Sequence, residues 1–311
     1  MNILVTGGAG FIGSNFIKYM FDRYPEYTIT NLDKLTYAGN LNNLHDIENN
    51  LSYSFVKGDI CDEDVVNNLA IDSDWIINFA AETHVDRSIQ DASLFVETDV
   101  LGTYQLLEAA RKHDCSYFQI STDEVYGSIV EGSFKEGDPL EPNSPYSASK
   151  AGAEMLVRAY NKTYGLNTLV TRSSNNFGCY QYPEKLIPIT ILNALQNKVI
   201  PVYGDGKNVR DWIYVIDNCR AIDVVLHKGK MGEVYNVGAG NEYTNLDIVC
   251  AILDILDKTH DLIGFVKDRP GHDWRYSVDT TKIGELGWSP EVDLKIGLGK
   301  TVSWYRDEYF R

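Results

Sequence analysis

The sequence has 311 residues, 44% of them hydrophobic, which suffices for one large domain or two modest ones with a packed core. Its formal net charge of −16 argues against a nucleic-acid binder, which needs a basic surface, although a few well-placed cations can still bind an anionic small molecule. No apolar run approaches the roughly 20 residues of a membrane span, and the five cysteines are scattered. We therefore expect no membrane partner and a cytoplasmic protein with reduced thiols.

Short apolar runs alternate with helical patterns through the first half of the chain. The predicted strands are Asn2–Thr6, Thr28–Leu32, Ser52–Lys57, Trp75–Phe79, Tyr117–Ser121 and Asn167–Arg172. The predicted helices are Gly13–Arg23, Glu63–Leu69, Phe95–His113 and Tyr146–Tyr164. This rhythm predicts an α/β fold with a Rossmann-like, doubly wound parallel sheet.

The rhythm weakens after about Arg172. Further expected elements are a helix at Leu186–Asn197, strands at Val199–Tyr203, Arg210–Tyr214 and Glu233–Val237, a helix at Asn245–Lys258, and an irregular segment from Phe265 to Ser277. We expect residues 1–172 to form the NAD-binding domain, with returning segments at about 208–237. Residues 173–207 and 238–311 would form a smaller, discontinuous substrate-binding lobe.

A glycine-rich turn follows the first strand and opens a helix. Gly7, Gly10 and Gly13 have the spacing G-x-x-G-x-x-G, which lets backbone N–H groups approach a pyrophosphate at the helix N-terminus. Asp33, at the end of the second strand, would accept hydrogen bonds from an adenosine ribose and repel a 2′-phosphate, which favours NAD over NADP. Lys34 could weaken this preference for NAD over NADP. Asp59 could hold the adenine edge, together with Ile60, or cap a helix.

Tyr146 and Lys150 are four residues apart, so on a helix they share one face. A free tyrosine is a poor base near neutral pH, because its pKa is about 10. A lysine charge nearby would favour the phenolate and lower that pKa, which would let Tyr146 remove a hydroxyl proton as hydride leaves. Thr122 would hydrogen-bond the same hydroxyl.

These motifs resemble the extended short-chain dehydrogenase/reductase superfamily, and further strings narrow the resemblance. They are Ala80–Ser88, Ser121–Gly127, Ser174–Gly178, Pro183–Pro188, Gly204–Lys207, Arg210–Trp212 and Asp268–Asp273. Together they resemble the dTDP-glucose 4,6-dehydratase family from Asn2 to about Tyr305. The resemblance implies a hydro-lyase with bound NAD, acting in nucleotide-sugar and deoxysugar biosynthesis.

The Thr-Asp-Glu string is the most specific element of this resemblance. Oxidation at C4 of a glucose unit acidifies the C5 proton, and elimination then needs a base at C5 and an acid at the C6 hydroxyl. Adjacent carboxyl groups can hold opposite protonation states when their environments differ. By analogy Asp123 is the acid and Glu124 the base. Sugar-nucleotide epimerases on the same fold usually lack this pair.

The resemblance also assigns binding residues. Cofactor contacts would include Phe11, Ile12, Leu35, Thr36, Ala80, Ala81, Thr98 and Asn176, besides Tyr146 and Lys150. The sugar nucleotide would contact His84, Thr122, Asn175, Lys185, Leu186, Pro201, Tyr203, Arg210, Asn245, Arg269 and His272. The arginines would grip the diphosphate, and Tyr203 would stack on or hydrogen-bond the nucleobase.

Three alternatives stay open. The chain could be another NAD-dependent sugar-nucleotide enzyme, namely a UDP- or CDP-glucose dehydratase, a 4-epimerase or a decarboxylase, or a non-catalytic NAD-binding regulator. The resemblance implies a homodimer that packs the helices Phe95–His113 and Tyr146–Tyr164 into a four-helix bundle; a monomer is the alternative. No histidine has metal-ligand spacing, so no metal is predicted.

Overall fold

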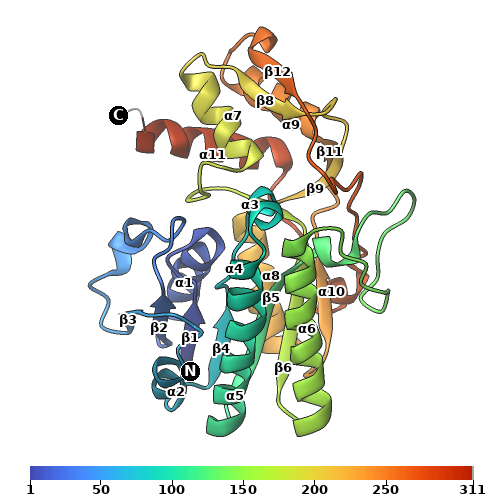
Figure 1. The fold of residues 1–311 in the computed structure, drawn as a ribbon. Coiled ribbons are helices and arrows are strands. Elements are labelled where there is room, and N and C mark those ends of the chain that lie inside the picture. The colour runs from blue at the N-terminus through green and yellow to red at the C-terminus, as the bar shows by residue number, and fades with distance from the viewer. Residues whose placement is uncertain (310–311) are drawn as a thin grey trace.

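The computed structural model describes residues 1–309, and its centre is a parallel sheet of seven strands in the order β10-β6-β5-β4-β1-β2-β3 (Figure 1). The strands are β1 (Asn2–Thr6), β2 (Thr28–Asp33), β3 (Tyr53–Lys57), β4 (Trp75–Asn78), β5 (Ser116–Thr122), β6 (Thr168–Ser173) and β10 (Val234–Val237). The predicted α/β, doubly wound class is therefore confirmed. The strand order reverses between β1 and β4, and ligands of such sheets bind beside that point.

Helices cover both faces of the sheet, because successive side chains of each strand point to opposite sides. Ile3 and Val5 of β1 join one core with helices α1 (Phe11–Arg23) and α8 (Val215–Lys228). Leu4, between them, joins the other core, with helices α2 (Glu63–Ala70), α5 (Thr103–His113) and α6 (Pro145–Tyr164). In Figure 1, α5 and α6 stand side by side in front of the sheet, with α8 behind it.

Helix α6 has clear start and stop signals. The Ser144 hydroxyl accepts a hydrogen bond from the Ser147 amide at 3.1 Å and forms a capping box, and Pro145 occupies the first helical position. Gly165 ends the helix with a φ of 71°. These local signals fix one unbroken helix of 20 residues, which carries Tyr146 and Lys150.

The smaller lobe lies over the carboxyl edge of the sheet (Figure 1). It contains the three-stranded sheet of β7 (Asn175–Phe177), β9 (Val209–Tyr214) and β11 (Glu242–Thr244), and the pair β8 (Ile200–Tyr203) and β12 (Ile263–Val266). Helices α7 (Leu186–Leu195), α9 (Asn245–Ile255) and α11 (Leu294–Tyr309) pack on a separate hydrophobic core, which includes Ile191 and Ile252. Short elements complete the described chain: η1 (Leu41–Ile47), α3 (Val85–Gln90), α4 (Ser93–Phe95), η3 (Asp123–Tyr126), η4 (His260–Leu262) and α10 (Thr281–Glu285).

Several predicted elements differ from the structure. The expected helix Phe95–His113 contains a π-helical turn, η2 (Val96–Gly102), before α5 begins. Helices α8 and α11 lie where no helix was predicted. Phe265 and Val266, placed in an irregular segment, pair in parallel with Val202 and Tyr203, a contact that local sequence does not encode.

No helix among residues 1–309 combines the length and apolar character that a membrane crossing requires.

Candidate active site

A cavity of about 650 Å³ opens between the carboxyl edge of the sheet and the lobe. Every residue predicted for cofactor, substrate or catalysis lines it, except Leu35. Leu35 has a φ of 55° in the turn after β2, and its backbone amide donates to Asp33 Oδ1 at 2.8 Å. Leu35 therefore supports Asp33 through its backbone, and the predicted contact of Leu35 with the cofactor stays a prediction.

The glycine-rich loop packs tightly against β4 and leaves the start of α1 open. Gly7 has a φ of 69°, and a Cβ added there would lie 2.5 Å from the Ala80 nitrogen. A Cβ at Gly13 would lie 2.5 Å from the Gly7 carbonyl oxygen. No side chain caps α1, and Phe11 and Ile12 of its first turn line the cavity. This arrangement suits the pyrophosphate of a dinucleotide.

Asp33 lies on the cavity wall at the end of β2, and its Oδ2 accepts a hydrogen bond from the Ala9 amide at 2.9 Å. Burial raises the pKa of Asp33, while the amides of Leu35 and Ala9 oppose that shift. Lys34, proposed to moderate NAD preference, pairs with Asp59 at 2.5 Å. Asp59 does not cap a helix, because Asp62 is the N-cap of α2. The residues present therefore fit NAD.

Tyr146 and Lys150 are both buried on one face of α6. The expectation that Lys150 lowers the pKa of Tyr146 is wrong for this structure. Burial, with the charges of Glu124 and Asp99, raises the pKa of Tyr146, and a hydrogen bond with Thr122 opposes that shift. The Lys150 ammonium instead donates to the Ile120 carbonyl at 2.9 Å, and burial lowers its own pKa.

The acid pair follows β5 directly, on the short helix η3. Thr122 caps this helix by accepting a hydrogen bond from the Glu124 amide at 3.2 Å, which fixes both acids at the cavity. Burial, with the nearby charges of Glu124 and Asp211, raises the pKa of Asp123 well above its usual range. Burial also raises the pKa of Glu124, but the cations Arg269, Lys185 and Arg210 oppose that shift. The proton is therefore held more strongly by Asp123 than by Glu124, because cations lie near Glu124 and carboxylates lie near Asp123.

Several buried polar atoms on the cavity wall have no hydrogen-bond partner within residues 1–309. They are Asp123 Oδ2, Asn175 Oδ1, Asn176 Oδ1, His84 Nδ1 and Arg269 Nε. Buried polar groups in proteins are almost always hydrogen-bonded. These atoms are therefore available to ligands at the predicted positions.

The predicted cations differ in how many hydrogen bonds they already form with the protein. Arg210 is buried, donates to the carbonyls of Val209, Asp273 and Trp274, and lies 4.3 Å from the centre of the Tyr276 ring. Lys185 donates to the Thr83 carbonyl at 2.7 Å. Arg210 is therefore held rigidly, so its charge is fixed in place.

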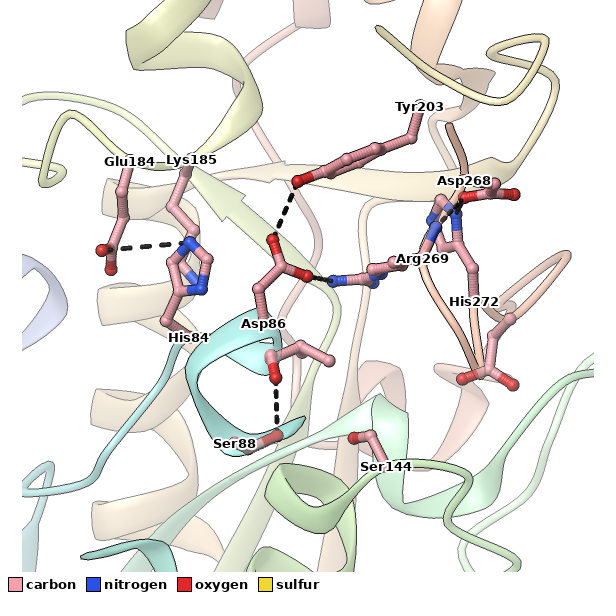
Figure 2. Close-up of polar contacts among 12 residues, drawn as sticks. His84, Asp86, Ser88, Ser144, Glu184, Lys185, Tyr203, Asp268, Arg269 and His272 are labelled. Carbon is pink, nitrogen blue, oxygen red and sulfur yellow. Dashed lines mark hydrogen bonds and ion pairs between the residues drawn. The ribbon is translucent and has the colours of Figure 1, made fainter. Parts of the chain in front are cut away.

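A cluster around Glu184 joins the two halves of the molecule, and sequence reasoning did not assign it. The Tyr37 hydroxyl donates to Glu184 Oε1 at 2.9 Å, and the Arg87 guanidinium lies 3.6 Å from the centre of the Tyr37 ring. Arg87 Nη2 lies 3.4 Å from Glu184 Oε2. His84 Nε2 lies 3.9 Å from the same oxygen, a contact that Figure 2 shows. Arg87 and Glu184 fall inside the strings that carry the family resemblance, which is the one sequence signal for them.

Asp99 is a second residue that the sequence did not single out. It lies on the π-helical turn η2, is 2% exposed, and accepts hydrogen bonds from Ser149 Oγ at 2.6 Å and from the Glu82 amide at 3.2 Å. Burial raises the pKa of Asp99 to about 6, and the Lys150 charge opposes that shift. The charge of Asp99 in turn favours the protonated form of Lys150, although Lys150 itself donates to the Ile120 carbonyl.

The family model described as GDP-mannose 4,6 dehydratase matches residues 4–301. The chain belongs to this family. It is 54% identical to the low-salt glycan biosynthesis protein Agl12 of Haloferax volcanii over 98% of each chain. It is 52% identical to the dTDP-glucose 4,6-dehydratase of Streptomyces niveus, over 99% of this chain and 93% of that one.

Solved structures of the dehydratase family agree with these matches. DesIV, a dTDP-glucose 4,6-dehydratase from Streptomyces venezuelae solved with NAD bound, has a TM-score of 0.97 at 48% identity, over 99% of this chain and 98% of DesIV. The predicted dTDP-glucose 4,6-dehydratase family and the predicted dehydratase class are therefore confirmed.

Proposed function

We propose that this protein is an NAD-dependent dTDP-glucose 4,6-dehydratase, which oxidises C4 of the hexose, eliminates water across C5 and C6, and yields dTDP-4-keto-6-deoxyglucose. The observation that carries the proposal is the adjacent acid pair in two different environments on one cavity wall. An enzyme that only oxidises C4 and then reduces it again would need no such pair. Elimination needs one carboxyl group in each protonation state.

NAD, when bound, supplies the site that accepts hydride from C4 and returns it to C6. We propose that the loop from Gly7 to Gly13 holds its pyrophosphate and that Asp33 holds the adenosine ribose. The charge of Asp33 would exclude a 2′-phosphate. Lys34 is paired with Asp59 and leaves that preference intact.

Three side chains transfer protons in the proposed reaction, and Thr122 and Lys150 assist them. Tyr146 accepts the C4 hydroxyl proton while Thr122 holds the same oxygen. The raised pKa keeps Tyr146 protonated at neutral pH in this structure, where the Lys150 ammonium donates to the Ile120 carbonyl. The proposed role therefore requires Lys150, on the same helix face, to approach the phenol when substrate is bound. Glu124 removes the C5 proton, and Asp123 donates a proton to the C6 hydroxyl as water leaves.

Incubation with dTDP-, UDP- and CDP-glucose, followed by mass detection of water loss, tests the proposal. We expect a 4-keto-6-deoxy product from dTDP-glucose, with the cofactor retained on the protein. A hexose that is epimerised but keeps its mass would favour the runner-up, a 4-epimerase. Water loss only from UDP- or CDP-glucose would support the dehydratase reaction but contradict the proposed preference for a thymine nucleotide.

The acid limb of the pH profile should report Glu124. A base acts only when it is deprotonated, so activity should be full above the pKa of Glu124 and be lost as the pH falls through it. Because burial raises that pKa, the midpoint should lie above the ordinary value for glutamate, about 4.3. Measurements of kcat/KM against pH check this, and a limb at or below the ordinary value would contradict it.

We also propose a homodimer. Apolar side chains that are at least 41% exposed lie on the segments α4, η2, α5 and α6, among them Leu94, Val96, Leu101, Tyr104 and Met155. A second copy would cover them in a four-helix bundle. Sedimentation should give twice the chain mass of 35.0 kDa, and Leu101→Glu should reduce it to one chain mass. A wild-type monomer would contradict the proposal.

The remaining assignments stay proposals. The expected returning segment at about 208–237 divides in the structure, because β9 belongs to the sheet of the lobe whereas β10 pairs with β6. We propose an NAD-binding domain of residues 1–172 with 215–237, and a substrate-binding lobe of 173–214 and 238–311. The pairing of β10 with β6 and the separate core of the lobe support this division. A cytoplasmic location is supported by five free cysteines, which persist as thiols in a reducing compartment.

A further inference from the structure

We propose that Asp86 is a positioning residue for the nucleotide end of the substrate, because it holds Tyr203 and Arg269 in the arrangement that receives a nucleoside diphosphate. The inference rests on the proposed function, which assigns these two side chains to nucleobase and diphosphate. It adds a residue that binds no substrate atom itself and acts through its two neighbours.

Asp86 lies at the second position of α3 and divides its two oxygens between separate segments of the lobe. The Tyr203 hydroxyl, at the end of β8, donates to Asp86 Oδ2 at 2.9 Å. Arg269 Nη1, in the segment after β12, lies 3.7 Å from Asp86 Oδ1. Figure 2 shows Asp86 between these two side chains, with His84 and Glu184 on its other side. One carboxylate from the sheet domain thus fixes two side chains of the lobe.

Arg269 depends on Asp86 for its orientation. Among residues 1–309, Asp86 is the single carboxylate that forms an ion pair with the Arg269 side chain, which is 20% exposed. Its buried Nε has no hydrogen-bond partner within that range. One edge of the guanidinium faces Asp86, so the remaining donors are free to grip a phosphate in a fixed direction.

Tyr203 is held in a similar way. Its ring is 41% exposed, and the ring of His272 meets it edge-on, with the centroids 6.4 Å apart. The hydroxyl hydrogen bond to Asp86 pins the far end of the side chain. Without it, the exposed ring could swing away from the position that flanks a nucleobase.

Asp86 also carries a negative charge close to the proposed diphosphate site. This charge repels the diphosphate and by itself would weaken substrate binding. The Asp86 side chain is 28% exposed, so water and salt partly screen that repulsion, although its Oδ1 atom is buried. Ordering two long side chains on binding costs conformational entropy, which Asp86 removes by ordering them beforehand. We therefore assign the net effect of Asp86 to tighter binding.

Two variants and one control test this assignment. Asp86→Ala removes both contacts, whereas Asp86→Asn keeps an acceptor for the Tyr203 hydroxyl and removes the charge beside Arg269. Asp91→Asn is the matched control, because Asp91 ends the same helix, is exposed and contacts only Ser93 through its side chain among residues 1–309. Thermal melting and NAD content show whether each variant is folded and loaded.

The readouts are kcat and KM with dTDP-glucose, and the Kd of dTDP on the NAD-loaded protein. Asp86→Ala should raise KM and Kd about tenfold, with kcat changed less than about twofold. Asp86→Asn should show a smaller rise, and Asp91→Asn none. An unchanged or lower Kd in Asp86→Ala, or a loss confined to kcat, would overturn the assignment. If the wild-type protein binds dTDP but forms no dehydrated product, the proposed function is wrong. The Kd values for dTDP would still test whether Asp86 positions the nucleotide-binding side chains.

Discussion

The Glu124→Gln variant should still accumulate reduced cofactor when mixed with dTDP-glucose, but it should form the 4-keto-6-deoxy product about 10²- to 10⁴-fold more slowly. Glutamine has the shape of glutamate and cannot accept the C5 proton. The oxidation step depends on Tyr146, Thr122 and Lys150, which the substitution leaves in place. Absorbance of the reduced nicotinamide follows the first step, and mass detection of water loss follows the second.

The environment of Glu124 makes this a sharp test. Arg269, Lys185 and Arg210 oppose the rise that burial causes in the pKa of Glu124, and the substitution removes the carboxyl group on which these cations act. Glu97→Gln is a suitable control, because Glu97 is exposed on η2. Product formation at the wild-type rate by Glu124→Gln would show that another group removes the C5 proton.

A second large effect is expected at the buried ion pair behind the acid pair. Glu154→Ala should destabilise the fold by about 3 to 5 kcal/mol, because it leaves the Arg172 charge buried without its partner. Both side chains are at most 5% exposed, and Arg172 Nη2 lies 2.6 Å from Glu154 Oε2. Ser121 also donates to Glu154, so the strand that ends in the acid pair loses a support. Chemical denaturation measures the free energy of unfolding.

An exposed ion pair supplies the comparison. Lys230→Ala should change stability by at most about 1 kcal/mol, because the Lys230 side chain is 82% exposed and lies 3.8 Å from Glu233. Glu154→Gln should fall between the two, since its amide keeps part of the hydrogen bonding. Equal stabilities for Glu154→Ala and Lys230→Ala would mean that the buried pair contributes little.

The elements predicted from the sequence agree with the structure where short stretches of sequence mark their ends. Helix α6 begins at a capping box and ends at a glycine, so the shared face of Tyr146 and Lys150 follows from spacing alone. The prediction failed for α8 and α11, which lie in the half of the chain where strand and helix signals no longer alternate. The proposed catalytic residues came from the spacing of Tyr146 and Lys150 and from the family strings. Their electrostatics could not be predicted, because the pKa of Tyr146 depends on Glu124 and Asp99, which are both remote in sequence.

The sequence by itself determined the sheet and the glycine-rich turn with Asp33, because strand patterns and turn chemistry act over a few residues. Most of the residues that line the cavity were predicted from the family resemblance, not from such local patterns. Only the tertiary structure decided how those residues influence one another. Asp86 and Tyr203 are 117 residues apart, and their contact exists because the lobe folds back over the sheet. Burial in that cavity, which no local pattern encodes, also separates the proton affinities of Asp123 and Glu124.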